Sequence, residues 1–131
     1  MLRKRKVSCT VSRNGDLIHK TYLQVKLPEL PAPGAGTNAW VENVGHMLIQ
    51  EVYIEIGGQQ IDKHYGDWLN VWNELTQTAE KESGYNVMIG NTADLTDPSN
   101  SAKDETTLYI PLQFWLNTDL KSNLHQTIRI V

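Results

Sequence analysis

The chain has 131 residues, of which 40% are hydrophobic and 21% are charged. This composition predicts one soluble globular domain and excludes a disordered chain. No run approaches the ~18 consecutive apolar residues of a membrane span, and the basic start lacks the apolar segment of a secretory signal. The single cysteine, Cys9, excludes an internal disulfide and fits a reducing compartment.

The net charge of −3 conceals an uneven distribution. Arg3, Lys4, Arg5 and Lys6 hold four of the 12 basic residues, which leaves eight basic against 15 acidic residues, a net charge of −7, in the rest of the chain. A generic nucleic-acid-binding domain spreads its basic residues over a face of the fold, so we expect no specific nucleic-acid partner. The cluster is interpreted either as a solubilising group or as a short arm that contacts nucleic acid or an acidic partner.

The first predicted elements form a hairpin. Alternation in residues 7–11 places Cys9 with two valines on one face, so Cys9 is interpreted as a small core residue and not as a nucleophile. Asn14-Gly15, followed by Asp16, is typical of a two-residue type I′ turn. Residues 17–27 alternate again, which predicts a strand with one buried and one solvated face.

The middle of the chain predicts two loops and a second hairpin. Residues 28–46 contain three prolines and three glycines and are expected to form a long surface loop. The next strand, residues 47–56, turns at Gly57-Gly58 into "QQIDKHY". Residues 85–106 are mostly polar and are predicted to be an exposed excursion.

One helix is expected, between Asp67 and Gly84. Its apolar residues recur every three or four positions, which predicts a stripe that packs against the core. The stripe comprises Trp68, Val71, Trp72, Leu75 and Ala79.

The last predicted strands are residues 106–117 and 125–131. Pro111 removes a ladder donor from the first of these and indicates an edge strand or a bulge. About six strands and one short helix, without a βαβ rhythm, predict an all-β fold: an antiparallel β-sandwich of jelly-roll type. Because a jelly roll has about eight strands, we expect residues 1–131 to be a single, incomplete domain or a fragment of a longer protein.

Candidate chemistry is sparse. Asp62 and His64 lie two residues apart on one face of a strand and could share a metal, but no third ligand accompanies them. We favour the interpretation that they orient the turn into the helix through hydrogen bonds. The chain has no nucleophile elbow, phosphate-binding loop or Cys-x-x-Cys motif. We therefore expect no enzyme activity, no catalytic, cofactor or metal site, and no small-molecule substrate.

Three ordered blocks carry a resemblance. "SRNGDLI", "YIEIGGQQIDKHYGDWLNVWNELT" and "LYIPLQFWLN" resemble the major capsid proteins of nucleocytoplasmic large DNA viruses, the iridovirus, phycodnavirus and mimivirus relatives. The match is to the first of the two jelly rolls of that capsid protein. The resemblance implies a structural role for a signature made of Asn14, Gly15, Asp16, Gly57, Gly58, Asp62, His64, Trp68, Trp72 and Pro111.

The resemblance also implies partners and a location. Three copies would form a homotrimeric, pseudo-hexagonal capsomer, and capsomers would tile an icosahedral shell with minor capsid proteins around an internal viral membrane. The protein would reside in the virion after assembly in the host cytoplasm. Two alternatives stay open: a carbohydrate- or ligand-binding β-sandwich module that uses Trp40, Tyr65 or Trp115, and a metalloenzyme built around Asp62 and His64.

Overall fold

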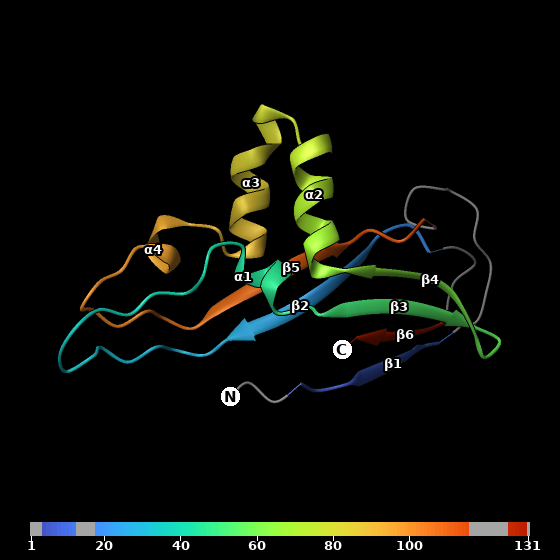
Figure 1. Ribbon diagram of the computed structural model, residues 1–131, viewed down its shortest axis with the longest axis horizontal. Coiled ribbons are helices and arrows are strands. Elements are labelled where there is room, and N and C mark those ends of the chain that lie inside the picture. The colour runs from blue at the N-terminus through green and yellow to red at the C-terminus, as the bar shows by residue number, and fades with distance from the viewer. Residues whose placement is uncertain (1–3, 13–17, 116–125, 131) are drawn as a thin grey trace.

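The strands form two antiparallel sheets. The computed structural model describes residues 4–12, 18–115 and 126–130. In this part of the chain one sheet has the order β1-β6-β3-β4 and the other pairs β2 with β5 (Figure 1). The strands are β1 (Val7–Val11), β2 (Thr21–Leu27), β3 (Glu51–Ile56), β4 (Gln59–Tyr65), β5 (Thr106–Leu112) and β6 (Gln126–Ile130).

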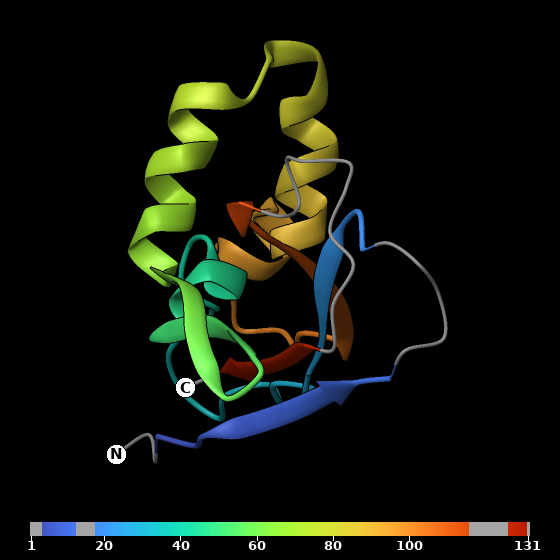
Figure 2. The same cartoon turned by 90° about the vertical axis from the view of Figure 1, so that its right-hand side faces the viewer.

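Four helices accompany these strands in the described residues, so the expectation of an all-β jelly-roll sandwich with one short helix is wrong. The fold is mixed α/β. Two helices have 11 residues each and stand side by side, projecting away from the sheets (Figures 1 and 2). The helices are α1 (Val44–Met47), α2 (Gly66–Thr76), α3 (Ala79–Ile89) and α4 (Ala93–Thr96).

The sequence does not predict helix α3, because the apolar residues of this segment show no helical period. Its sequence, "AEKESGYNVMI", is mostly polar, and its one buried residue is Ile89 at the C-terminal end. The helix runs through Gly84, which we had expected to end α2, and stops at Gly90 with φ of 79°. A left-handed glycine after the last turn is a frequent helix stop signal.

The two predicted loops pack against each other. Leu30 and Asn38 form isolated β-bridges with Lys103 and Ser99, respectively, and their backbone N···O distances lie between 2.8 and 3.1 Å. The Lys103 side chain is buried, and its Nζ donates to the backbone carbonyls of Asp94 and Asp97 at 2.7 and 2.9 Å. The expectation that residues 85–106 form an exposed excursion is therefore wrong.

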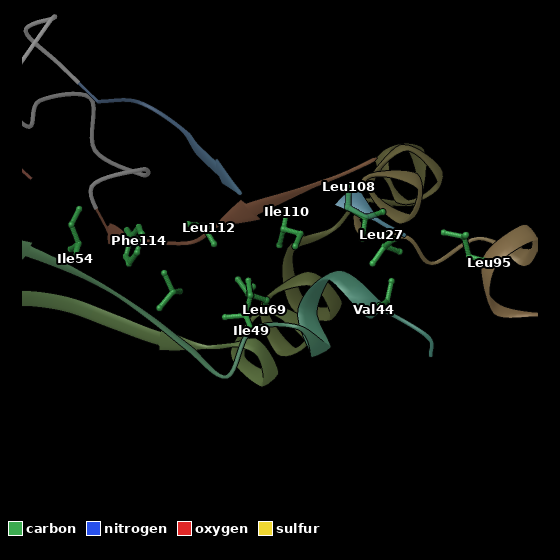
Figure 3. Close-up of a cluster of buried hydrophobic side chains, with 11 residues drawn as sticks. Leu27, Val44, Ile49, Ile54, Leu69, Leu95, Leu108, Ile110, Leu112 and Phe114 are labelled. Carbon is green, nitrogen blue, oxygen red and sulfur yellow. The ribbon is translucent and has the colours of Figure 1, made fainter. Parts of the chain in front are cut away.

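The core lies where β3, β5 and the first turns of the helices meet (Figure 3). Strand β5 contributes every second residue, as its alternation predicted, whereas β1 is almost entirely exposed. Cys9 is exposed, so its interpretation as a core residue is wrong. The buried cluster comprises Leu27, Val44, Ile49, Val52, Ile54, Leu69, Leu95, Leu108, Ile110, Leu112 and Phe114.

Helix α2 presents most of the predicted apolar stripe to solvent, although Trp72 is half-buried and Ala79 lies in α3. The exposed fraction is 40% for Trp68 and 73% for Leu75, whereas Leu69, outside the stripe, is 1% exposed. The cause lies at Gly66, the first residue of α2, where an added Cβ would overlap the carbonyl oxygens of His46 and Ile49. This close approach turns Leu69 inward and the stripe outward, so the expectation that the stripe packs against the core is wrong.

Leu69→Ala should destabilise the fold by ~2–5 kcal/mol, because it removes a fully buried side chain and leaves a cavity. Leu75→Ala, in the same helix but on the exposed side, should change stability by no more than ~0.5 kcal/mol. Urea denaturation of the two variants measures both values. Equal losses would show that α2 is rotated differently.

Gly66→Ala should destabilise the chain because the new methyl group meets two backbone carbonyls that cannot move aside as a side chain would. Gly84→Ala is the matched control, since no atom lies within 4 Å of its added Cβ. Alanine in that helical position should stabilise the chain by ~0.5–1 kcal/mol. Thermal melting of both variants should give shifts of opposite sign, and a neutral Gly66→Ala would contradict the packing at this junction.

Candidate functional site

Asp62 and His64 join the two sheets through a side-chain ladder. Both side chains project from one face of β4. Asp62 Oδ2 accepts a hydrogen bond from the Trp115 backbone N–H at 2.8 Å, and His64 Nε2 accepts from the Gln113 N–H at 3.4 Å. The two acceptor side chains, which are two residues apart, thus pair with two backbone N–H donors that are also two residues apart. This is the spacing of residues on one face of a strand. The pair holds the segment that follows β5.

The environment of His64 keeps its imidazole neutral. The ring is 5% exposed and meets Phe114 edge-on, with 4.8 Å between centroids. Burial lowers the pKa of His64 to about 4, and the charge of nearby Asp62 opposes this shift only in part. Because Nε2 accepts a hydrogen bond, the proton resides on Nδ1, a buried atom with no hydrogen-bond partner among the described residues.

Aromatic side chains surround a cavity beside this ladder. Its volume is about 510 Å³, and its lining includes Asp62, His64 and Phe114 together with five residues of the strand-to-helix passage and the segment after β5. The Trp68 and Trp72 rings lie 5.9 Å apart between centroids at an interplanar angle of 39°. The five further residues that line the cavity are Lys63, Tyr65, Trp68, Trp72 and Trp115. Trp40, a candidate for ligand binding on sequence grounds, packs against the hydrophobic core instead.

A second buried polar cluster was not predicted from the sequence, where His46 appeared isolated. His46 Nδ1 lies within hydrogen-bond distance of Asn70 Oδ1, and its Nε2 lies 2.8 Å from the Tyr85 hydroxyl. The amide oxygen can only accept, so Nδ1 donates to Asn70 and the Tyr85 hydroxyl donates to Nε2. One imidazole therefore links α1, α2 and α3. Only knowledge of the helix packing could have found it, because its partners lie 24 and 39 residues away.

Both ionisable groups of this cluster stay neutral near pH 7. Burial lowers the pKa of His46, although the hydrogen bond to Asn70 opposes the shift. Burial also raises the pKa of Tyr85 to about 12. A neutral, fully hydrogen-bonded histidine and an un-ionised tyrosine are arranged to hold helices together and not to exchange protons.

The remaining signature residues serve turns and edges. Gly57 and Gly58 have φ of 59° and 81° and form the predicted turn between β3 and β4. Pro111 lies opposite Tyr22 in β5, which pairs with β2 alone among the described strands, so the predicted edge position is confirmed. Asn14, Gly15 and Asp16 lie outside the described residues.

Neither a metal cluster nor a membrane helix is present in the described part of the chain. No group of three or more His, Cys, Asp or Glu side chains converges there in a way that could hold a metal ion. No helix in the same residues combines the length and apolarity needed to cross a bilayer.

Comparison with known proteins identifies the family. A family model described as "Major capsid protein N-terminus" matches residues 2–127. The chain belongs to the major capsid protein family. The major capsid protein of Pyramimonas orientalis virus is 51% identical over 112 residues, covering 85% of this chain and 27% of its own length.

Two solved structures resemble this capsid-family chain. PBCV-1 VP54, fitted into a cryo-EM reconstruction of the virophage Sputnik, superposes with a TM-score of 0.78 at 28% identity, over 97% of this chain and 30% of VP54. A chain of a quasi-atomic model of the PBCV-1 virus capsid gives 0.74 at 28% identity, over 96% and 30%, respectively. The chain spans about a quarter of the length of the relatives that it matches.

The free energy of unfolding should fall as the pH decreases from 6.5 to 4. Unfolded His64 binds a proton near its ordinary pKa of 6.5, whereas folded His64 binds one only near 4, so acid favours the unfolded chain. At ~1.4 kcal/mol per pKa unit, the loss is on the order of 3 kcal/mol, and His46 adds to it with the same sign. Urea titrations across this range should show a shallower pH dependence for His64→Gln than for the parent chain. Parallel curves would contradict the assignment.

Proposed function

We propose that this chain is the N-terminal part of a major capsid protein, a structural building block of the icosahedral shell of a large DNA virus. The observation that carries the proposal is the match of the capsid N-terminal family model to residues 2–127. The strand-turn-helix passage that holds Gly57, Asp62 and Trp68 is the longest of the three sequence blocks that resemble the family. The protein would reside in the virion, and residues 1–131 would form the N-terminal part of such a subunit, a proposal that the match to the N-terminal family model supports.

The polar side chains of the chain suit a structural role. Asp62 and His64 are engaged with backbone N–H groups of the neighbouring segment. His46 and Tyr85 bond to each other across helices. These side chains hold elements in place, and none of them presents a general base to a substrate. This use of potential catalytic groups supports a non-enzymatic building block.

The partners that we propose are other copies of the same capsid protein. Three copies would form a pseudo-hexagonal homotrimer, and capsomers would contact minor capsid proteins and an internal viral membrane. A related chain forms part of a quasi-atomic model of the PBCV-1 virus capsid, which supports assembly of repeated copies. The exposed apolar side chains on α2 also suit a subunit that is covered by neighbours.

Purified virions of the virus that encodes this chain should contain it in an amount typical of the main shell component. Quantitative mass spectrometry of tryptic peptides from residues 1–131 measures that amount, and native mass spectrometry of released capsomers should give three copies. Absence of these peptides from purified particles would overturn the capsid proposal. Capsomers of another copy number would overturn the trimer while leaving the capsid role in place.

A further inference from the structure

The outward side of α2 is an apolar surface that the described residues of the chain leave uncovered. Trp68, Val71 and Leu75 have exposed fractions of 40%, 47% and 73%. Positions spaced by three and four residues lie on one side of a helix, so these side chains form one continuous strip. An exposed apolar patch of this kind on a soluble domain usually marks an interaction surface.

The strip continues into the aromatic cavity. Trp68 belongs to both, Trp72 lines the cavity beside it, and Tyr65 and Trp115, which are 51% and 47% exposed, extend the apolar surface across β4 to the segment after β5. Half-exposed tryptophan and tyrosine rings beside a hollow resemble the central residues of protein interfaces. A partner segment would therefore have both a flat strip and a hollow to fill.

Acidic side chains border this strip. Asp67 and Glu74 are exposed and lie four and three residues from Val71, on the side of the helix away from Leu69. Helix α2 carries no basic residue, and the first turn of α3 adds Glu80 and Glu82 on either side of Lys81. The outer α2 face, defined as Asp67, Trp68, Val71, Trp72, Glu74 and Leu75, is thus both apolar and negatively charged.

The chain itself contains a segment of complementary chemistry. Lys4, Arg5 and Lys6 precede β1 and are exposed, and Lys6 Nζ already lies 5.5 Å from the centroid of the Tyr53 ring. Figures 1 and 2 place β1 and the α2–α3 pair on opposite sides of the molecule. The basic segment therefore lies on the side away from the α2 helix of the same copy.

We propose that residues 4–6 of one copy dock on the outer α2 face of a neighbouring copy. Their cationic groups would pair with Asp67 and Glu74, and an Arg5 or lysine side chain would stack on the exposed Trp68 ring. The inference rests on the proposed capsid function, because it needs copies held side by side. Packing of α2 against α2 of a second copy is disfavoured, since a two-fold contact would bring the acidic residues of one helix close to the acidic residues of the other.

This contact is head-to-tail: one side of each copy meets the opposite side of the next. Contacts of this type close into a ring or continue as an extended array, according to the rotation between copies. Both outcomes suit a shell in which subunits form capsomers and capsomers form a lattice. The proposal assigns the basic segment to a protein partner, and nucleic-acid binding by the same segment becomes an outcome of the test.

The test is a titration of a fluorescein-labelled peptide of residues 1–8 with the 131-residue chain, followed by fluorescence anisotropy at low salt. The peptide should bind, and binding should weaken as salt screens the charges. Asp67→Lys with Glu74→Lys in the chain should weaken binding by about ten-fold or more. Glu29→Lys with Glu42→Lys, which changes the net charge equally at exposed sites elsewhere, should change it by less than about two-fold.

A charge swap completes the test. A peptide with Lys4→Glu, Arg5→Glu and Lys6→Glu should fail to bind the parent chain and should bind the variant with Asp67→Lys and Glu74→Lys. Circular dichroism confirms that each variant is folded. Equal weakening by both pairs of lysine substitutions, failure of the swapped peptide, or binding to duplex DNA without binding to the chain would each overturn the proposal. Since this assay contains no virion, its failure leaves the capsid role in place.

Discussion

The contact of Gly66 with the carbonyls of His46 and Ile49 sets the arrangement of everything above the sheets. Strand β4 ends at Tyr65 and α2 begins at Gly66, where there is no space for a side chain. Because the first turn of α2 presses against the α1 segment, the rotation of the whole helix is fixed there. Leu69 then points into the core, and Trp68 points outward over the aromatic cavity.

Polar contacts then hold the helices that this junction positions. His46 lies in the segment touched by Gly66, and its two ring nitrogens reach Asn70 on α2 and Tyr85 on α3. Helix α3 buries little apolar surface, so a buried imidazole with both nitrogens satisfied replaces part of the packing that other helix pairs obtain from leucines. Asp62 and His64 do the same between sheets, where their side chains accept hydrogen bonds from backbone N–H groups of the segment after β5.

The sequence predicted the parts of this fold that follow local rules. Alternation located β2, β3 and β5, and Gly57-Gly58 marked the turn between β3 and β4. Pro111 indicated an edge strand, since a residue without an N–H cannot serve a central ladder. These signals depend on neighbouring residues alone. They do not fix which strands pair, and the predicted hairpin of residues 7–27 is wrong, because β1 pairs with β6 and β2 pairs with β5.

The orientation of α2 and the existence of α3 depend on contacts between distant residues. The stripe through Trp68 and Leu75 has a correct helical period, but periodicity does not say whether a face meets a core or a partner. Helix α3 has no such period, and its contacts with His46 and β5 become visible only after folding. The candidate site is only partly predictable for the same reason. The sequence indicates Asp62 and His64 as a pair on one face of a strand, but it does not indicate their backbone partners at residues 113 and 115.

The proposed role as a capsid subunit offers a physical reason why the apolar stripe of α2 faces outward. A monomeric enzyme buries its best amphipathic face inside itself, because exposed tryptophan and leucine favour aggregation. A subunit of a closed shell must instead expose an apolar face that its neighbours cover on assembly, with charges around that face to select the correct partner. In this chain the outer α2 face carries Asp67 and Glu74, while an exposed basic segment lies on the opposite side. If the proposed contact between copies forms, the uneven charge of the sequence and the outward stripe of α2 share one explanation, a polarity that orients each copy relative to the next.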